Sequence, residues 1–158
     1  LVLTISEIPH VKRLRIHSRL PVVLPDRLSK SCISILSTHR LQTVFVIHCN
    51  HANEIDGPLA AKLGEMRQAG VTLLNQTVLL KGVNNQPATL CKLSEKLFNV
   101  GVLPYYLHVL DRVQGAAHFE MSDRAARALH VQMMESLPGY LVPKLVRENP
   151  ACAYKVPL

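Results

Sequence analysis

Side chains that could bind ligands or move protons follow several apolar segments of this sequence. The segment at 48–54 (HCNHANE), Asn75–Gln76 and Asp111 each come after a run rich in aliphatic, β-branched or aromatic residues. Parallel strands of an α/β fold point their carboxyl ends toward one edge, and ligands bind beyond that edge. If these runs are such strands, we expect His48, Gln76 and Asp111 to converge on one site.

The loop at 48–54 has two possible roles. His48 and His51 could both offer an imidazole nitrogen to a metal ion, but a pair three residues apart on an irregular loop has no defined ligand face. The spacing implies no third ligand, so we interpret the loop as a hydrogen-bonding segment and predict no metal site within the chain. Asp111 also has an alternative role, because an acid after a strand often only starts a turn.

Lys155 is a candidate nucleophile in the last segment of the sequence. A lysine amine can form a Schiff base when it is partly desolvated or placed beside other cations. A single lysine in such a segment is normally a solvated charge, and the residues around it do not show which environment it has.

Apolar runs and amphipathic segments alternate along the chain, as expected for a parallel α/β sheet or part of a barrel. Tyr105–Leu110 is apolar on both faces, which is typical of a parallel strand covered by helices. Asp56 and Gly70 bracket one helix as its N-cap and its stop. Four or five strands are too few for a closed eight-stranded barrel, so we predict a partial one. The predicted strands are 11–16, 42–48, 71–74, 105–110 and 142–146, and the predicted helices are 26–39, 56–70, 86–100 and 123–137.

Length and composition narrow the class of protein. With 158 residues, 48% of them hydrophobic and 18% charged, the chain can bury one core of about a single domain. No run reaches the roughly eighteen apolar residues of a membrane span. The net charge of +7 would favour anionic partners, but the basic residues are scattered and no basic–aromatic interleaving marks a nucleic-acid surface. We therefore predict neither a membrane nor a nucleic-acid partner.

The cysteines and the two ends of the sequence give expectations about cellular location and about completeness. Its four cysteines show no CxxC or CxxxCxxC spacing, which fits a reducing, cytoplasmic location where they are buried small hydrophobes. The sequence starts at Leu1 and stops soon after Lys155, so both ends look cut and we expect a fragment of a longer protein.

Five blocks in a fixed order carry a family resemblance. They are SRLPVVLPDRL, HCNHANEI, NQTVLLKGVNN, LPYYLHVLD and GYLVP, the last followed by a lysine sixteen residues after its glycine. Together they resemble the lysine 2,3-aminomutase family, radical S-adenosylmethionine enzymes that also use pyridoxal 5′-phosphate. LDRVQGAAHF and PGYLVPKL look most similar to the bacterial branch that makes (R)-β-lysine for the modification of elongation factor P.

The resemblance implies a fold and a division of the chain. The fold would be α/β, the second half of a partial (β/α)6 radical S-adenosylmethionine barrel with parallel strands and outer helices. Residues 1–138 would form the half-barrel, and residues 139–158 would form a C-terminal segment that carries the lysine for pyridoxal phosphate. The missing N-terminal half of the same enzyme would be a partner, and the enzyme would be a homo-oligomer.

The resemblance also implies site residues and cofactors. Lys155 would be the catalytic lysine that binds pyridoxal 5′-phosphate. His48 and Gln76 would contact S-adenosylmethionine. Asp111 and Glu148 would hold the cationic end of L-lysine, because an ammonium group in a partly dry pocket needs paired carboxylates. The CxxxCxxC motif for the [4Fe–4S] cluster is absent and would lie upstream, as would the arginines for the cofactor phosphate and the substrate carboxylate.

The resemblance implies an isomerase that converts L-α-lysine to β-lysine through a radical derived from S-adenosylmethionine and a pyridoxal phosphate aldimine. The fragment alone would be inactive. A free-lysine aminomutase and a non-catalytic half-barrel binding module are the alternatives, and an upstream CxxxCxxC block would favour an enzyme over the module. Glutamate is a poor substrate candidate because the paired acids Asp111 and Glu148 suit a cation. The loop before Lys155, NPACAY, lacks the glycines usual in the family, which leaves its backbone fewer options with φ > 0.

Overall fold

Among the described residues, six strands form one sheet whose spatial order follows the sequence, from β1 to β6. The computed structural model describes residues 1–111 and 113–158. Neighbouring strands pair in parallel from β1 through β5, and β6 runs antiparallel to β5. The strands are β1 (Arg13–Ser18), β2 (Gln42–Ile47), β3 (Thr72–Leu79), β4 (Leu103–Val109), β5 (Lys144–Arg147) and β6 (Val156–Pro157). The predicted α/β class with parallel strands is confirmed.

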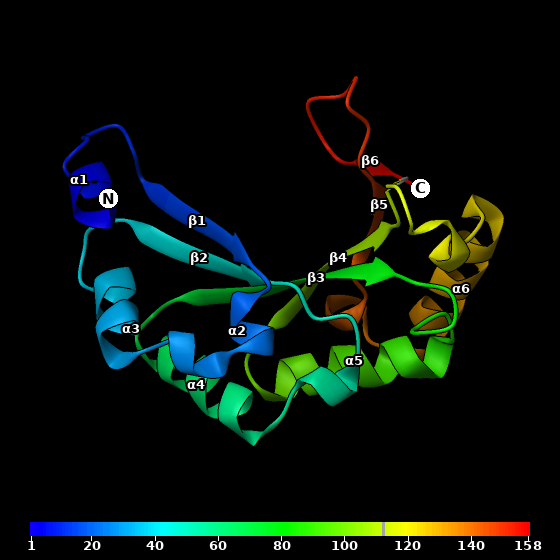
Figure 1. Cartoon of the computed structure of the whole chain (residues 1–158), viewed down its shortest axis with the longest axis horizontal. Helices are drawn as coiled ribbons and strands as arrows, with labels where there is room; N and C mark the ends of the chain where they lie inside the picture. The colour runs from blue at the N-terminus through cyan, green and yellow to red at the C-terminus, as the bar shows by residue number, and fades with distance from the viewer. Residues whose placement is uncertain (112) are drawn as a thin grey trace.

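Helices fill the connections between successive strands. The α-helices are α1 (Val2–Ser6), α2 (Leu20–Val23), α3 (Lys30–Ser37), α4 (Gly57–Gln68), α5 (Pro87–Asn99) and α6 (Asp123–Ser136). The sheet is curved, and α3, α4 and α5 lie along its convex side (Figure 1). The concave side opens upward in this view, between α1 at one end of the arc and the C-terminal segment at the other.

Local sequence explains where the central helices begin and end. The Asp56 carboxylate accepts a hydrogen bond from the Leu59 backbone N–H at 2.9 Å, which caps α4 as predicted. Gly101 follows α5 with a φ of +81°, a conformation that glycine adopts most readily. A Cβ atom at Gly101 would also lie only 2.4 Å from Arg67 Cδ, so both the backbone angle and the space favour glycine there.

The core lies between the convex face of the sheet and the helices. Its fully buried members include Leu59, Leu63 and Met66 on α4, Leu90, Leu93 and Leu97 on α5, and Ile47, Leu79 and Leu107 on the strands. Side chains alternate between the two faces of a strand, and Phe45 and Ile47 belong to this core. Val46 therefore points to the concave side, as do Gln76 and His108 on β3 and β4. The concave face thus carries the polar side chains that could meet a ligand.

Four details differ from the expectations. β3 runs to Leu79 instead of ending at residue 74, so Gln76 lies inside the strand and not after it. The helix expected over 26–39 is divided into a 3-10 turn at Pro25–Arg27 and α3. The N-cap of α6 is Ser122, not Asp123, because the Ser122 side chain accepts the hydrogen bond from Ala125 N. β6 was not predicted, since two residues are too short to show a pattern.

No helix in the described ranges 1–111 and 113–158 has the length and apolar character needed to cross a membrane.

Candidate active site on the concave face

Lys155 lies directly before β6, and the pairing of β6 with β5 determines where its side chain goes. Arg147 pairs with Val156, so Glu148 and Lys155 lie side by side one step beyond that pair. Lys155 Nζ donates to Glu148 Oε2 at 2.5 Å and lies 5.8 Å from the centre of the Tyr106 ring. The hydrogen bond from Lys155, together with its charge, lowers the pKa of Glu148. With 26% of its side chain exposed, Lys155 is a partly desolvated amine held by a carboxylate.

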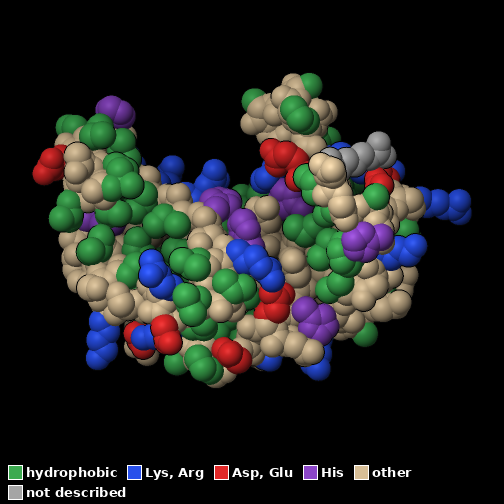
Figure 2. Space-filling view, in the orientation of Figure 1, with side chains coloured by type: hydrophobic (Ala, Val, Ile, Leu, Met, Phe, Trp, Pro, Cys, Tyr) green, Lys and Arg blue, Asp and Glu red, His purple; other side chains and the backbone are tan. Residues whose placement is uncertain are grey.

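A cavity of about 450 Å³ opens beside Lys155, and we call it the lysine cavity. Its lining comes from β1, β3, β4 and the C-terminal segment: Arg15, His17, Gln76, Tyr106, Glu148, Cys152, Ala153, Tyr154 and Lys155. In the space-filling view, histidine and basic side chains gather along the hollow between the two raised ends of the molecule (Figure 2). The fold therefore brings Gln76 and Lys155, which are far apart in the sequence, to one cavity.

A second cavity, of about 630 Å³, shares Glu148 with the first, and we call it the acidic cavity. Asp111 and Glu120 add two more carboxylates to its lining. Arg147 also lines it, but its guanidinium is bound by both carboxylate oxygens of Asp123, which offsets its charge. Asp111 and Glu148 make this cavity suited to a cationic group.

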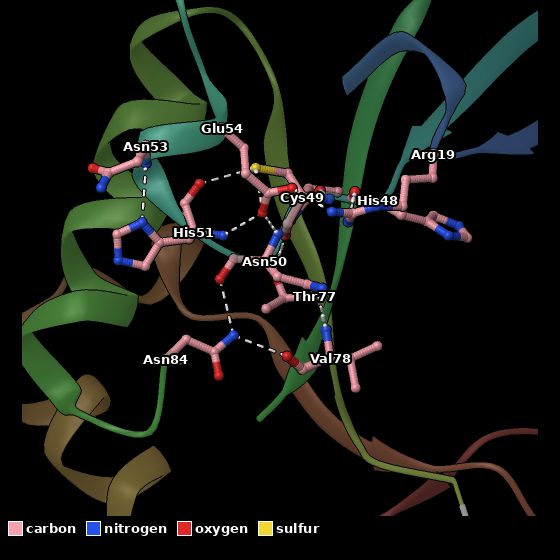
Figure 3. Close-up of polar contacts among 11 residues, drawn as sticks. Arg19, His48, Cys49, Asn50, His51, Asn53, Glu54, Thr77, Val78 and Asn84 are labelled. Carbon is pink, nitrogen blue, oxygen red and sulfur yellow. Dashed lines mark hydrogen bonds and ion pairs between the residues drawn. The ribbon is translucent and has the colours of Figure 1, made fainter. Parts of the chain in front are cut away.

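The segment 48–54 is a hydrogen-bonded frame at the carboxyl end of β2 (Figure 3). Glu54 Oε1 accepts from the backbone N–H groups of Asn50 at 2.6 Å and His51 at 2.8 Å. Arg19 donates to Glu54 Oε2 at 2.6 Å and to the His48 carbonyl at 2.9 Å, which fastens the loop to the end of β1. The predicted hydrogen-bonding role of this loop is confirmed.

His51 has a hydrogen-bonding role within this loop. His51 Nδ1 accepts from the Asn53 backbone N–H at 3.1 Å and caps a short 3-10 helix at Ala52–Glu54. Within the described ranges, no three His, Cys, Asp or Glu side chains lie close enough together to hold a metal ion.

Two buried asparagines connect this loop to β3. Asn75 Oδ1 accepts from Cys49 N at 2.9 Å, and Asn75 Nδ2 donates to Cys49 O at 3.0 Å. Asn84 Nδ2 donates to the carbonyls of Asn50 and Val78, both at 2.9 Å. By holding the backbone of Cys49 and Asn50, these asparagines fix the position of the neighbouring loop residue, His48. Sequence reasoning noted Asn75 only as a neighbour of Gln76 and gave Asn84 no role, because burial and pairing cannot be read from residue type.

Three buried polar atoms on the concave side have no hydrogen-bond partner among the described residues: His48 Nε2, Gln76 Oε1 and His108 Nε2. Burial lowers the pKa of His48, with smaller contributions from the positive charges of Arg19 and Lys155. Burial and then the charge of Lys155 lower the pKa of His108 to about 4. Native proteins satisfy nearly all buried polar groups, so this row of atoms marks a place where a ligand could bind.

Comparison with known proteins finds homologues. No family model matches the chain. The L-lysine 2,3-aminomutase of Escherichia coli (strain K12) is 50% identical over 158 residues, which are 100% of this chain and 46% of that protein. The L-lysine 2,3-aminomutase of Haemophilus influenzae is 52% identical over 148 residues, 94% of this chain and 44% of that protein. The chain is homologous to the L-lysine 2,3-aminomutases.

A more distant relative also matches this chain over only part of its own length. The L-lysine 2,3-aminomutase of Clostridium subterminale is 35% identical over 165 aligned residues, 100% of this chain and 38% of that protein. The chain spans about half the length of the first curated relatives it matches, and it corresponds to their C-terminal half.

The residues that the family resemblance singled out fall into two groups. Lys155, Glu148 and Gln76 line the lysine cavity, and Asp111 and Glu148 line the acidic cavity. His48 lies next to the lysine cavity, because its ring is edge-on to that of His17 with the centroids 5.9 Å apart. The single site expected of His48, Gln76 and Asp111 is not found as one pocket. Gln76 lines the lysine cavity, His48 lies beside it, and Asp111 lines the acidic cavity, which shares Glu148 with the first.

His108 is the residue of this face that sequence reasoning missed. It was counted as part of the apolar run YYLHVL. The available signal was a polar imidazole in an otherwise apolar buried strand, two positions after Tyr106 and therefore on the same face of β4.

Proposed function

We propose that the chain is part of an L-lysine 2,3-aminomutase, an isomerase that moves the α-amino group of L-lysine to the β-carbon. Homology to these enzymes supports this reaction. The observation that carries the proposal is the Lys155–Glu148 pair, which lies where the lysine cavity meets the acidic cavity. The curved sheet with helices on its convex side supports a partial (β/α)6 barrel, whose other half would come from the rest of the longer protein.

Lys155 would hold pyridoxal 5′-phosphate, and the surroundings fit such a group. The amine is ordered by Glu148, the Tyr106 ring lies close to it, and Arg15 brings a guanidinium to the same cavity where an anion could bind. When bound, pyridoxal phosphate supplies an electron sink that stabilises a radical next to nitrogen. The contribution of this chain is to fix the amine and to limit its contact with water.

His48 and Gln76 would contact S-adenosylmethionine, which supplies the initiating radical when it is bound at a [4Fe–4S] cluster. Their unpartnered buried atoms, His48 Nε2 and Gln76 Oε1, fit a ligand with hydrogen-bonding groups. The cluster ligands would come from the rest of the protein. Cys49 is a poor candidate, because burial and the charge of Glu54 raise the pKa of its thiol to about 12.

Asp111 and Glu148 would bind the side-chain ammonium of the substrate lysine. Glu148 already binds an alkylammonium group in this structure, that of Lys155. It lies between the two cavities, so an ammonium in the acidic cavity would meet Glu148 from one side and Asp111 from another. Two carboxylates can offset the desolvation of one ammonium group better than a single carboxylate can.

The wider role rests on the motifs LDRVQGAAHF and PGYLVPKL. They support the branch that makes (R)-β-lysine for the modification of elongation factor P. We propose that the whole enzyme is a cytoplasmic homo-oligomer. Residues 139–158 would be the segment that carries the pyridoxal lysine, although β5 within it also continues the sheet.

The proposal is tested by trapping the cofactor in the longer protein that carries this chain. Borohydride reduction should fix pyridoxal phosphate onto Lys155, and peptide mass spectrometry should find the label there. Lys144 is the matched control, because it is the other lysine of the C-terminal segment and its position on β5 is exposed. A label on Lys144, or retention of the label in a Lys155→Ala variant, would refute the assignment.

A further inference from the structure

His108 is buried on the concave face, and one of its two ring nitrogens lacks a hydrogen-bond partner among the described residues. It is 4% exposed, and its neighbours across the sheet are Val78 on β3 and Val146 on β5. Its Nε2 atom has no hydrogen-bond partner among the described residues. Aliphatic neighbours cannot satisfy an imidazole, and buried polar groups are rarely left unsatisfied in native proteins. A structural role in the core does not explain this residue.

His108 and Lys155 both lie near the ring of Tyr106. The Tyr106 ring is edge-on to the His108 ring, with the centroids 5.6 Å apart, and Lys155 Nζ lies 5.8 Å from the centre of the same Tyr106 ring. Among the charged and titratable groups that act on His108, Lys155 has the largest effect, followed by Glu148, then His48 and His17.

The chemistry of His108 suits a polar heteroaromatic ligand. Burial and the positive charge of Lys155 both favour the neutral imidazole, which has one nitrogen that donates and one that accepts. A ring attached to Lys155 and placed over Tyr106 would bring its own oxygen or nitrogen atoms toward this part of the face. Such a ligand would replace the partner that His108 lacks.

We propose that His108 is a ligand-binding residue whose imidazole hydrogen-bonds to the pyridoxal group carried by Lys155. The inference rests on the proposed function, because it requires pyridoxal phosphate at Lys155. It adds a residue on β4 to the cofactor site and predicts that this strand, as well as the C-terminal segment, determines cofactor affinity.

The test compares three variants of the longer protein that carries this chain. His108→Phe keeps a ring but removes both nitrogens, His108→Gln keeps a hydrogen-bonding group, and His10→Phe is the control at an exposed histidine. Absorbance titration with pyridoxal phosphate should show affinity about tenfold weaker for His108→Phe, the effect of one lost hydrogen bond. Affinity should recover to within about threefold in His108→Gln and be unchanged in the control.

A second measurement uses the wild-type protein and does not depend on how the variants fold. In protein with ¹⁵N-labelled histidine, the His108 Nε2 resonance should shift when pyridoxal phosphate is added, and the His10 resonances should not. Unchanged cofactor affinity in folded His108→Phe, or a loss of S-adenosylmethionine affinity alone, would overturn the assignment. An Nε2 resonance that does not move would also overturn it. If wild-type protein takes up no pyridoxal phosphate on Lys155, the proposed function itself fails, which separates the two outcomes.

Discussion

Asn75 offers a sharp test of how the site is held together. The side chain is 1% exposed and joins the carboxyl end of β2 to β3 through both its oxygen and its nitrogen. Replacing it with alanine removes the acceptor for the Cys49 N–H and the donors to the Cys49 carbonyl and to Thr77 Oγ1. We expect Asn75→Ala to destabilise the protein and to loosen the loop that positions His48.

The magnitude follows from the bonds that are lost. The Cys49 carbonyl keeps a hydrogen bond from Thr77 Oγ1 at 3.0 Å, so its loss is small. The Cys49 N–H is left buried without its acceptor, which costs about 1–3 kcal/mol, and the two further bonds contribute about 0.5–1.5 kcal/mol each. The free energy of unfolding should therefore fall by about 2–6 kcal/mol. Asn53→Ala is the control, because Asn53 is exposed and is joined to His51 in Figure 3 through its backbone N–H, which alanine keeps.

Two measurements check the expectation in the longer protein. Urea unfolding should show the loss for Asn75→Ala and a change below about 0.5 kcal/mol for Asn53→Ala. Hydrogen exchange should speed up at the Cys49 amide by about 5- to 150-fold, the rate equivalent of 1–3 kcal/mol. Wild-type stability together with unchanged exchange at Cys49 would show that Asn75 does not hold this loop.

Three other changes test separate parts of the site and fold. Asp111→Asn should reduce kcat/KM for lysine by an amount equal to about 2–5 kcal/mol, whereas the control Asp26→Asn, which does not line the acidic cavity, should not, and equal values would remove Asp111 from substrate binding. The pKa of His108 is lowered from 6.5 to about 4, so below pH 6.5 the unfolded state binds a proton that the folded state excludes. Stability should fall as the pH drops from about 6.5 to 4, by at most about 3 kcal/mol from this group, and a stability curve in His108→Gln with the same slope would contradict the expectation. Gly101→Ala should destabilise by about 1–3 kcal/mol because of its positive φ and the contact with Arg67, which thermal unfolding would show, whereas Gly64→Ala on α4 should not destabilise.

Much of the fold could be predicted because it depends on local patterns. The strand Tyr105–Leu110 was recognisable from an apolar run with no charge, and α4 from its Asp56 cap and Gly70 stop. Asn75 and Gln76 were misread as the end of a strand, because polar residues usually mark a strand end. Here Asn75 is buried against Cys49, and Gln76 faces the concave side, so β3 continues through both. Residue type alone cannot distinguish a polar residue that ends a strand from one that has a buried partner.

The position of Lys155 depended on information that no local pattern contains. β6 is only two residues long, yet its pairing with β5 sets Lys155 beside Glu148. The spacing of seven residues between them is the length of chain needed to leave β5, turn and return antiparallel. The turn NPACAY makes this return with no residue at positive φ, so glycines are not required for it in this chain.

The single negative charge of Glu148 affects the binding of cationic groups in both cavities. Its carboxylate binds the Lys155 ammonium in this structure and also lines the acidic cavity proposed for the substrate ammonium. One carboxylate oxygen is occupied by Lys155, and if the Lys155 nitrogen were bound covalently to a cofactor, Glu148 would be free to receive a second ammonium. A lysine substrate would then find a more favourable site after the cofactor is in place than before. Ordered binding of this kind follows from one carboxylate placed between two cationic groups, with Asp111 providing the charge that the second cation needs.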